Sequence, residues 1–378
     1  MKWYYVANAR MPNEKAHGIQ IAKMCEAFIE AGIELELVVP ARQTAPGSVQ
    51  NFYGLAVPVP MTKLAILDGY RWGRVGYAIS SLTFMLSYLL FFVGKRMRGE
   101  RFILYTMDID TFASAALALI GQPIYTEMHV ARAWNPALAL LFRKVKGVIT
   151  INSIIIRELR DRFPRVAYVA APNGVDLTRF GGKSRDKARR TLSLPSDERI
   201  VLYAGRFLEW KGLEILPLAA ADFPRDTLLY MVGGTKEEFE SLTRRSAPAA
   251  MRFVGEQPHQ LMPLWLAAAD VLLVIGTKRD AQSYFYTSPM KLFEYLAAGR
   301  SIVASGTPAI REIVSEAEVS FYAPDEPSAL AEAVRAALAD PQTAADRSTC
   351  AARKALEYSW ERRAQKIIGF VRTTAEMS

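Results

Sequence analysis

The sequence predicts two α/β domains in succession, each built on a mostly parallel sheet with helices on both faces. Short apolar runs typical of buried strands alternate with stretches of helical periodicity along the chain, which is the pattern of βαβ units. The same alternation starts again after the segment PNGVD at residues 172–176. A length of 378 residues is also long for one hydrophobic core and fits two.

The first half contains six candidate strands, and a helix over residues 17–31 follows the first of them. The expected strands are KWYYVAN (2–8), ELELVVP (34–40), RFILYT (101–106), PIYTEMHV (123–130), GVITIN (147–152) and AYVAAP (167–172). Because a parallel pair needs a crossover, helices are expected between these strands.

One apolar segment allows three interpretations. Residues 75–93 contain no charged side chain, and Lys95, Arg96, Arg98 and Arg101 follow them. This length and this basic flank reach the threshold for a membrane span. The serines, the tyrosines and the βαβ rhythm favour a core helix of the first domain instead. A helix that lies on a membrane surface is the third alternative.

The second half repeats the alternation. Its expected strands are RIVLYAG (199–205), TLLYMVGG (227–234), MRFVG (251–255), DVLLVI (270–275) and SIVAS (301–305), with helices over 211–221, 236–246, 258–268 and 287–299. Prolines and glycines cluster over residues 172–182, which places the boundary there. We expect an N-terminal domain over 1–172 and a second domain over 173–356. A last helix within 357–378, read from ALEYSWERRAQKIIGFV (355–371), is expected to pack back on the first domain.

Composition excludes several classes of protein. The two cysteines, Cys25 and Cys350, lie far apart, so neither a disulfide framework nor a structural metal centre is expected. We expect a reducing, cytoplasmic compartment. Residues 1–172 hold 20 lysines and arginines against 12 acidic residues, and the remainder holds 27 against 26. Nearly all of the net charge of +9 therefore belongs to the first half, which carries +8 and suits an anionic surface such as a membrane. No nucleic-acid-binding motif is present, and no nucleic-acid partner is expected.

The segment YAGRFLEWKG at residues 203–212 has the composition of a diphosphate site. A strand ends at Gly205, and the cations Arg206 and Lys211 follow in the loop and at the start of a helix. Ligands of doubly wound sheets bind at the carboxyl ends of the strands, where such cations engage phosphate oxygens. Solvated loop cations are the alternative interpretation.

A second candidate anion site is the start of the helix over residues 287–299. The backbone amides of Met290 and Lys291 are free to receive phosphate oxygens, and Pro289 suits the first helical position. Glu294 lies one turn further in, where its carboxylate is able to accept hydrogen bonds from the two ribose hydroxyls of a nucleotide. The alternative is that Glu294 only interacts favourably with the helix dipole.

These segments resemble glycosyltransferase family 4, which has the GT-B fold of two Rossmann-like domains facing each other across a cleft. EYLAAGRSIVAS matches the second half of that family's donor-site signature, with Glu294 as the second of its two glutamates. YAGRFLEWKG resembles its diphosphate segment, APNGVD (171–176) its interdomain hinge, and PLWLAAADVLLV (263–274) the helix and strand before the donor site. The likeness covers residues 165–310 in order and spacing. PNEKAHGIQIAKMCEAFIEAG (12–32) and YTEMHV (125–130) are similar to its first-domain segments.

The resemblance implies roles for individual residues. Catalytic candidates are His129, Arg206 and Lys211. Donor and nucleotide contacts are expected from Gly18, Arg206, Lys211, Gly233, Glu256, Tyr286, Ser288, Met290, Lys291 and Glu294. His17 and Glu127 are candidates on the acceptor side, with Glu127 holding either the loop or the acceptor. His259, in GEQPH (255–259), is expected only to line the pocket of the base.

One position departs from the family pattern. Tyr286 stands where the first glutamate is expected, eight residues before Glu294. No metal is expected, because cations and amides are able to neutralise the diphosphate. The DID segment at 108–110 has the spacing of a metal-binding carboxylate pair and is interpreted as a feature of a strand end.

The implied function is that of a retaining glycosyltransferase, hexosyl-transferring and of the cell envelope. It would move a sugar from a UDP- or GDP-linked donor to a saccharide or lipid-linked acceptor, at the cytoplasmic face of the membrane and with no cofactor. Two alternatives stay open: a non-catalytic scaffold or binding protein, favoured by Tyr286, and a nucleotide-sugar epimerase or phosphorylase of the same fold. The donor base and sugar, the acceptor, the linkage and the oligomeric state are not determined by the sequence.

Overall fold

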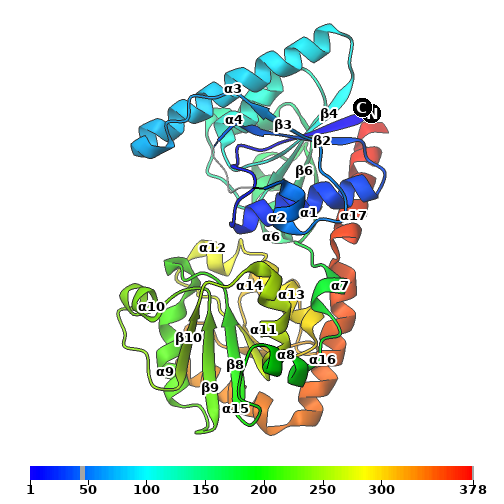
Figure 1. The fold of residues 1–378 in the computed structure, drawn as a ribbon. Coiled ribbons are helices and arrows are strands. Elements are labelled where there is room, and N and C mark those ends of the chain that lie inside the picture. Colours follow the sequence, from blue (N-terminus) through cyan, green and yellow to red (C-terminus); the bar gives the residue numbers. More distant parts are fainter. Residues whose placement is uncertain (43–46, 377–378) are drawn as a thin grey trace. The chain divides into compact units, whose positions relative to one another are not determined.

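The computed structural model describes residues 1–42 and 47–376, and the chain divides into two compact units (Figure 1). Unit 1 consists of Met1–Pro172 together with Trp360–Ser378, and unit 2 consists of Asn173–Ser359. The first unit thus ends at the residue expected from the proline–glycine cluster. Its C-terminal part begins at Trp360, three residues later than expected, and the last two residues of the expected segment lie outside the described residues.

Unit 1 is built on a seven-stranded sheet in the order β3-β2-β1-β4-β5-β6-β7, and its strand pairs are parallel. Its strands are β1 (Lys2–Val6), β2 (Leu35–Pro40), β3 (Met61–Leu64), β4 (Phe102–Met107), β5 (Ile124–Met128), β6 (Val145–Thr150) and β7 (Ala167–Ala170). Its helices are α1 (Ala16–Glu30), α2 (Val49–Tyr53), α3 (Gly73–Met97), α4 (Thr111–Ala116), α5 (Pro136–Phe142), α6 (Ser153–Arg162) and α17 (Trp360–Glu376).

Unit 2 is built on a six-stranded parallel sheet in the order β10-β9-β8-β11-β12-β13. Its strands are β8 (Arg199–Ala204), β9 (Thr227–Val232), β10 (Met251–Gly255), β11 (Val271–Val274), β12 (Ser301–Ser305) and β13 (Ser320–Tyr322). Its helices are α7 (Leu177–Phe180), α8 (Arg185–Thr191), α9 (Leu216–Ala221), α10 (Lys236–Thr243), α11 (Met262–Ala268), α12 (Ala281–Tyr284), α13 (Met290–Ala298), α14 (Pro308–Arg311), α15 (Pro327–Ala339) and α16 (Pro341–Ala355).

The strands of unit 2 bury side chains on both faces. On β8, Ile200 and Leu202 belong to one hydrophobic cluster, whereas Val201 and Tyr203 belong to a second. Successive side chains of a strand point to opposite faces, so the two clusters are the two helix-covered sides of the sheet. This explains why β8 is a nearly continuous apolar run in the sequence.

Three expected helices are shorter in the structure: α10 ends at Thr243, α11 begins at Met262 and α13 begins at Met290. Two other expected helices differ for a reason that the structure shows. The helix expected over 211–221 is α9 and starts at Leu216, because two short 3₁₀ turns precede it and Gly212 between them has a φ of 74°. The segment 355–371 is not one helix. Helix α16 ends at Ala355 and α17 begins at Trp360, because Ser359 pairs with Val175 in a parallel bridge and Val175 donates its N–H to the carbonyl of Tyr358, 2.9 Å away.

Helix α3 is the apolar segment that allowed three interpretations, and one of its faces belongs to the core of unit 1. Phe84, Tyr88 and Phe92 are fully buried, and Phe92 packs edge-on against Tyr4 of β1. The opposite face is exposed and apolar. By length and composition alone the helix is also able to cross a membrane, as many core helices are.

Candidate functional site

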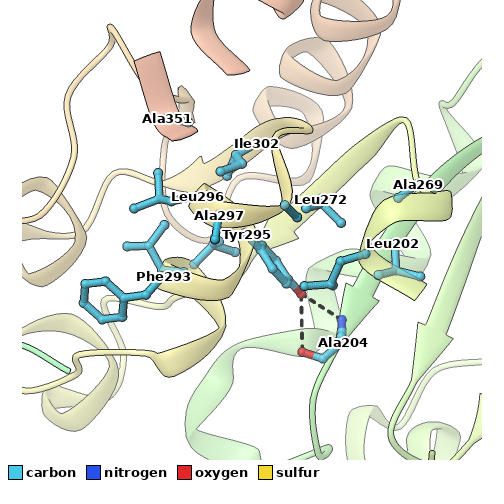
Figure 2. Packing of buried hydrophobic residues seen from close by; sticks show 14 of the residues in the cluster. Leu202, Ala204, Ala269, Leu272, Phe293, Tyr295, Leu296, Ala297, Ile302 and Ala351 are labelled. Atoms are coloured by element: carbon cyan, nitrogen blue, oxygen red, sulfur yellow. Dashed lines mark hydrogen bonds between the residues drawn. The ribbon is translucent and has the colours of Figure 1, made fainter. Parts of the chain in front are cut away.

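The carboxyl end of β8 is fixed against helix α13 by one tyrosine. Strand β8 pairs with β11 at Val201 and Leu202, whereas its pairing with β9 continues to Ala204. The Tyr295 hydroxyl meets the β11-side backbone of Ala204: it accepts from the Ala204 N–H at 3.0 Å and lies 3.5 Å from its carbonyl oxygen (Figure 2). Tyr295 is fully buried. The start of α13 and the loop after β8 are therefore held as one piece.

Two glycines let the backbone of neighbouring strand ends approach closely. Gly205 has a φ of 138° and Gly233 a φ of 125°, which are conformations that side chains rarely allow. A Cβ on Gly233 would lie 2.7 Å from the carbonyl carbon and oxygen of Gly205. At Gly205 itself the nearest side-chain atoms to such a Cβ are Lys211 Nζ and the Tyr203 hydroxyl oxygen, both at 3.6 Å. The ends of β8 and β9 thus form a bare backbone surface beside the Lys211 ammonium.

The two cations expected to bind diphosphate lie at this strand end. The Lys211 ammonium folds back and donates to the Arg206 carbonyl oxygen at 2.6 Å, while the side chain of Arg206 is exposed. Burial, together with the positive charge of Arg206, lowers the pKa of Lys211 to about 8. Lys211 thus holds its charge at a cost that a bound anion would offset.

Lys291 places a third cation at the same strand end. It is the second residue of α13, and its Nζ lies 4.1 Å from the ring centroid of Tyr203 on β8. Burial lowers the pKa of Lys291 well below its ordinary value, and the charge of Lys211 lowers it further, while Glu294 opposes this. The first amides of α13 also have no acceptor within their helix. The sequence analysis used only the amide of Lys291, so its side chain was missed.

Glu294 is paired with His259, which was expected only to line the pocket of the base. His259 Nε2 lies 3.1 Å from Glu294 Oε1, and the side chain of Glu294 is 14% exposed. The expectation that His259 only lines the pocket of a base is therefore incomplete, because its ring also orients this carboxylate. The two residues are 35 positions apart, and no local spacing signals their contact.

The remaining donor-side candidates of unit 2 have different environments. The Ser288 hydroxyl accepts from the Asn173 N–H at 3.1 Å, and its carbonyl accepts from Asn173 Nδ2 at 2.7 Å, so Ser288 anchors the 171–176 segment. Glu256 is exposed just after β10. The backbone of Tyr286 closes a turn with Gln282, because the Tyr286 N–H lies 3.3 Å from the Gln282 carbonyl. Met290 is the first residue of α13.

In unit 1, Glu127 is the centre of a buried polar cluster. It is fully buried, and it accepts from Arg363 Nη2 at 2.5 Å and from the Tyr105 hydroxyl at 2.7 Å. Gln20 and His129 also bond to Glu127 Oε1. Burial raises the pKa of Glu127, but the Arg363 charge and the bond from His129 outweigh it, so the pKa is lowered overall. Of the two roles considered for Glu127, this environment favours holding the loop.

The two histidine candidates of unit 1 lie near this cluster. His129 Nε2 is 2.8 Å from Glu127 Oε1 and 3.3 Å from Gln20 Nε2, and its side chain is 28% exposed. Burial, with the charges of Lys15 and His129, lowers the pKa of His17 to about 4, so His17 is neutral at physiological pH. The exposed part of His129 is therefore the accessible edge of the cluster.

Gly18 has a packing reason that the sequence did not reveal. A Cβ at this position would lie 2.5 Å from the Tyr53 hydroxyl and 2.7 Å from the side-chain amide of Asn13. Gly18 is buried, so it is needed here whether or not a ligand approaches its backbone.

The carboxylates of the DID segment have structural partners. Asp108 pairs with Arg132 at 3.0 Å, and Asp110 caps the N-terminus of α4 and bonds to Asn8 and Ser81. Within residues 1–42 and 47–376, no group of three or more histidine, cysteine or acidic side chains is placed to hold a metal ion.

Residues 184–354, most of unit 2, match the family model described as glycosyl transferases group 1. The phosphatidyl-myo-inositol mannosyltransferase of Mycobacterium tuberculosis is 27% identical over 249 residues, which cover 63% of this chain and 62% of that protein. The chain thus matches only about half to three-fifths of the length of the first curated relatives.

Solved structures match the chain over almost its whole length. The sucrose-phosphate synthase of Thermosynechococcus elongatus superposes with a TM-score of 0.77 at 19% identity and full coverage of both chains. The HepE protein of Anabaena, solved with UDP and glucose, superposes with a TM-score of 0.74 at 17% identity, over 99% of this chain and all of that chain. The chain thus has the two parallel-sheet α/β units of the GT-B glycosyltransferases, and its second unit matches the glycosyl transferases group 1 family over residues 184–354.

Proposed function

We propose that this protein is a retaining glycosyltransferase that uses a nucleotide diphosphate sugar. The observation that carries the proposal is the cluster of Arg206, Lys211, Lys291 and the start of α13 at the carboxyl end of β8, inside the region that matches the family. In parallel α/β sheets this edge is where ligands bind. UDP in the HepE structure supports a nucleotide donor.

The cluster suits the chemistry of sugar transfer. The bond between the anomeric carbon and the diphosphate oxygen breaks, and the electron pair leaves with the diphosphate. Fixed cations and amides that face the leaving oxygens stabilise this charge without reorganisation, and they are worth several kcal/mol where water is excluded. In this role Lys211 and Arg206 contact the diphosphate, and Glu294 holds the ribose. Retention at the anomeric carbon follows from the resemblance.

Binding of nucleoside diphosphates tests the donor side. UDP and GDP, and their sugars, should bind the full-length protein and raise its melting temperature. Lys211→Met should weaken this binding and lower kcat/KM together, because its charge acts before and during departure of the diphosphate. Lys187→Met, on exposed helix α8, is the matched control. If no nucleoside diphosphate binds the wild type, the proposed function is wrong.

Product analysis separates transfer from the alternatives. An epimerase would convert the donor sugar without an acceptor, and a phosphorylase would require free phosphate. A scaffold, the alternative that Tyr286 raises, would function in cells with Arg206→Ala and Lys211→Ala. A transferase should instead release UDP or GDP in proportion to acceptor glycosylated.

We also propose a lipid-linked or membrane-proximal acceptor in cell-envelope synthesis, with unit 1 bound to the cytoplasmic face of the membrane. Helix α3 exposes apolar side chains spaced three, four or seven residues apart, hence along one face: Val75, Leu82, Leu86, Leu90, Val93 and Met97. Unit 1 holds 24 lysines and arginines against 14 acidic residues. An apolar face on a basic unit suits an anionic bilayer surface, and the name of the mannosyltransferase relative supports a lipid acceptor.

Flotation with vesicles tests the membrane proposal. The protein should float with vesicles that contain anionic lipid, and less so as salt rises. Leu86→Gln with Leu90→Gln should abolish flotation, because both side chains are more than half exposed on the α3 face. Leu218→Gln with Leu356→Gln makes the same change at exposed leucines of unit 2 and should not. Wild type that stays unbound at low salt would contradict the proposal.

A further inference from the structure

The ammonium of Lys291 is buried and has no hydrogen-bond partner among the residues that the structure describes. Burying an ammonium group without hydrogen bonds costs several kcal/mol, so native proteins seldom do it. The resemblance to known glycosyltransferases gives this side chain no role. Its place in the fold therefore requires a separate explanation.

The surroundings of Lys291 Nζ include the Lys211 ammonium, a carboxylate and an aromatic ring. The ring of Tyr203 lies under the nitrogen at 4.1 Å, which stabilises the cation in part and fixes its position. Lys211 is close enough to affect the titration of Lys291, and Arg206 in turn affects that of Lys211. Glu294, one turn along the same helix, is the nearby carboxylate, and its Oε1 is bonded to His259.

Repulsion between the Lys211 and Lys291 ammonium groups indicates which kind of ligand would bind beside them. Two ammonium groups that face one strand end destabilise each other unless an anion lies between them. The α13 amides, at the positive end of a nine-residue helix, add to the same field. The ligand that matches two neighbouring ammonium groups, that of Lys291 fully buried, and a helix N-terminus is a compact anion with two or more negative charges.

We propose that the Lys291 side chain binds the diphosphate of the donor directly, as a second ammonium group opposite Lys211. This inference rests on the proposed function and extends it to a side chain, at a residue from which the resemblance implied only a backbone amide contact. In the ligand-free protein the burial of Lys291 is unfavourable, and the diphosphate supplies the missing hydrogen-bond acceptors. The lowered pKa values of both lysines agree with the assignment, because burial and neighbouring positive charge disfavour the ammonium forms in the ligand-free protein.

One variant should show two opposite effects, on thermal stability and on affinity for diphosphate. Lys291→Met keeps the length and the apolar stem of the side chain but removes the charge. The ligand-free variant should therefore melt at the same temperature as the wild type or higher. Its affinity for UDP, GDP and inorganic pyrophosphate should fall at least tenfold, while its affinity for uridine and guanosine should not change. Lys187→Met, with an exposed lysine, should alter neither quantity.

Calorimetry of the full-length protein with these probes decides the question. Lys291→Gln is the second variant, because an amide tolerates a polar environment if methionine disturbs folding. Equal pyrophosphate affinity in wild type and in both variants would overturn the assignment, as would equal loss of nucleoside and diphosphate binding, which indicates a structural role. If the wild type binds UDP or GDP and the Lys291 variants bind them with the same affinity, this inference alone is refuted. A wild type that binds none of the probes refutes the proposed function as well.

Discussion

Lys211 has a pKa of about 8, so its charge is lost within a pH range that is easily reached. The ordinary value of a lysine is about 10.4, and the difference arises because burial and Arg206 disfavour the ammonium form. A bound diphosphate reverses this preference. The residue is therefore a site where ligand binding and proton binding are coupled.

We expect UDP affinity to fall as the pH rises above 8. Above this pH the free protein must take up a proton on Lys211 to bind the diphosphate. Because one proton is taken up, the affinity for UDP falls by up to about tenfold for each pH unit. Arg206 lowers the pKa of Lys211, and Lys211 in turn lowers that of Lys291, whose other neighbours are Glu294 and the ring of Tyr203. Calorimetric titration from pH 7 to 10 measures the slope. Lys211→Met should flatten it, and an unchanged slope would contradict this account.

Glu294 should act on binding rather than on the chemical step. If it holds only the ribose, Glu294→Ala should raise the donor KM by roughly tenfold to a hundredfold, since a hydrogen bond to a charged group is worth about 1.5–3 kcal/mol. His259→Ala, which removes the group that orients Glu294, should raise the KM less. The control is Glu332→Ala, with an exposed carboxylate on α15. A fall in kcat without a change in KM would argue for a different role.

At the scale of elements, the sequence predicted what is local and missed what is distant. Strands β8, β9 and β12 follow from their apolar runs, and the segments 203–212 and 287–299 reached the site because their residues are neighbours in the chain. Strands β3 and β13 were missed, since the β3 sequence MTKL is interrupted by polar residues and β13 has only three residues. The Glu127–Arg363 contact joins positions 236 apart, and the break at Ser359 depends on Val175. No local pattern contains that information.

Helix α13 depends on the Tyr295 hydroxyl for its attachment to β8. Tyr295→Phe should leave the buried Ala204 N–H without its acceptor, which costs about 1–3 kcal/mol of unfolding free energy. It should also weaken UDP binding, because Lys291 and the loop after β8 lose their common anchor. Urea unfolding and UDP titration measure the two effects. The matched control is Tyr5→Phe, whose hydroxyl is buried with no partner among the described residues and should be dispensable.

At the scale of the whole molecule, the chain leaves unit 1 at Pro172 and returns to it at Trp360. The returning helix α17 packs beside α1 and carries Arg363, which is almost fully buried. Arg363 donates to Glu127 through Nη2, and its Nε donates to the carbonyls of Ala171 and Pro172 at 3.1 and 3.0 Å. One guanidinium thus joins β5, the end of the first segment and the last helix, so unit 1 is complete only when both parts of the chain are folded together.

Removal of Arg363 alone should therefore lower the free energy of unfolding of unit 1 more than removal of both charges, those of Arg363 and Glu127. Arg363→Met leaves the Glu127 carboxylate buried without its cation, which should cost about 3–5 kcal/mol. Glu127→Gln combined with Arg363→Met should recover much of this loss, because no unpaired charge stays buried, although the two backbone carbonyls still lose their donor. Arg362→Met, at the neighbouring position, is the control and lies on an exposed face. Urea unfolding of the full-length variants gives the coupling energy, and additive effects of the two substitutions would show that the buried pair does not hold the last helix in unit 1.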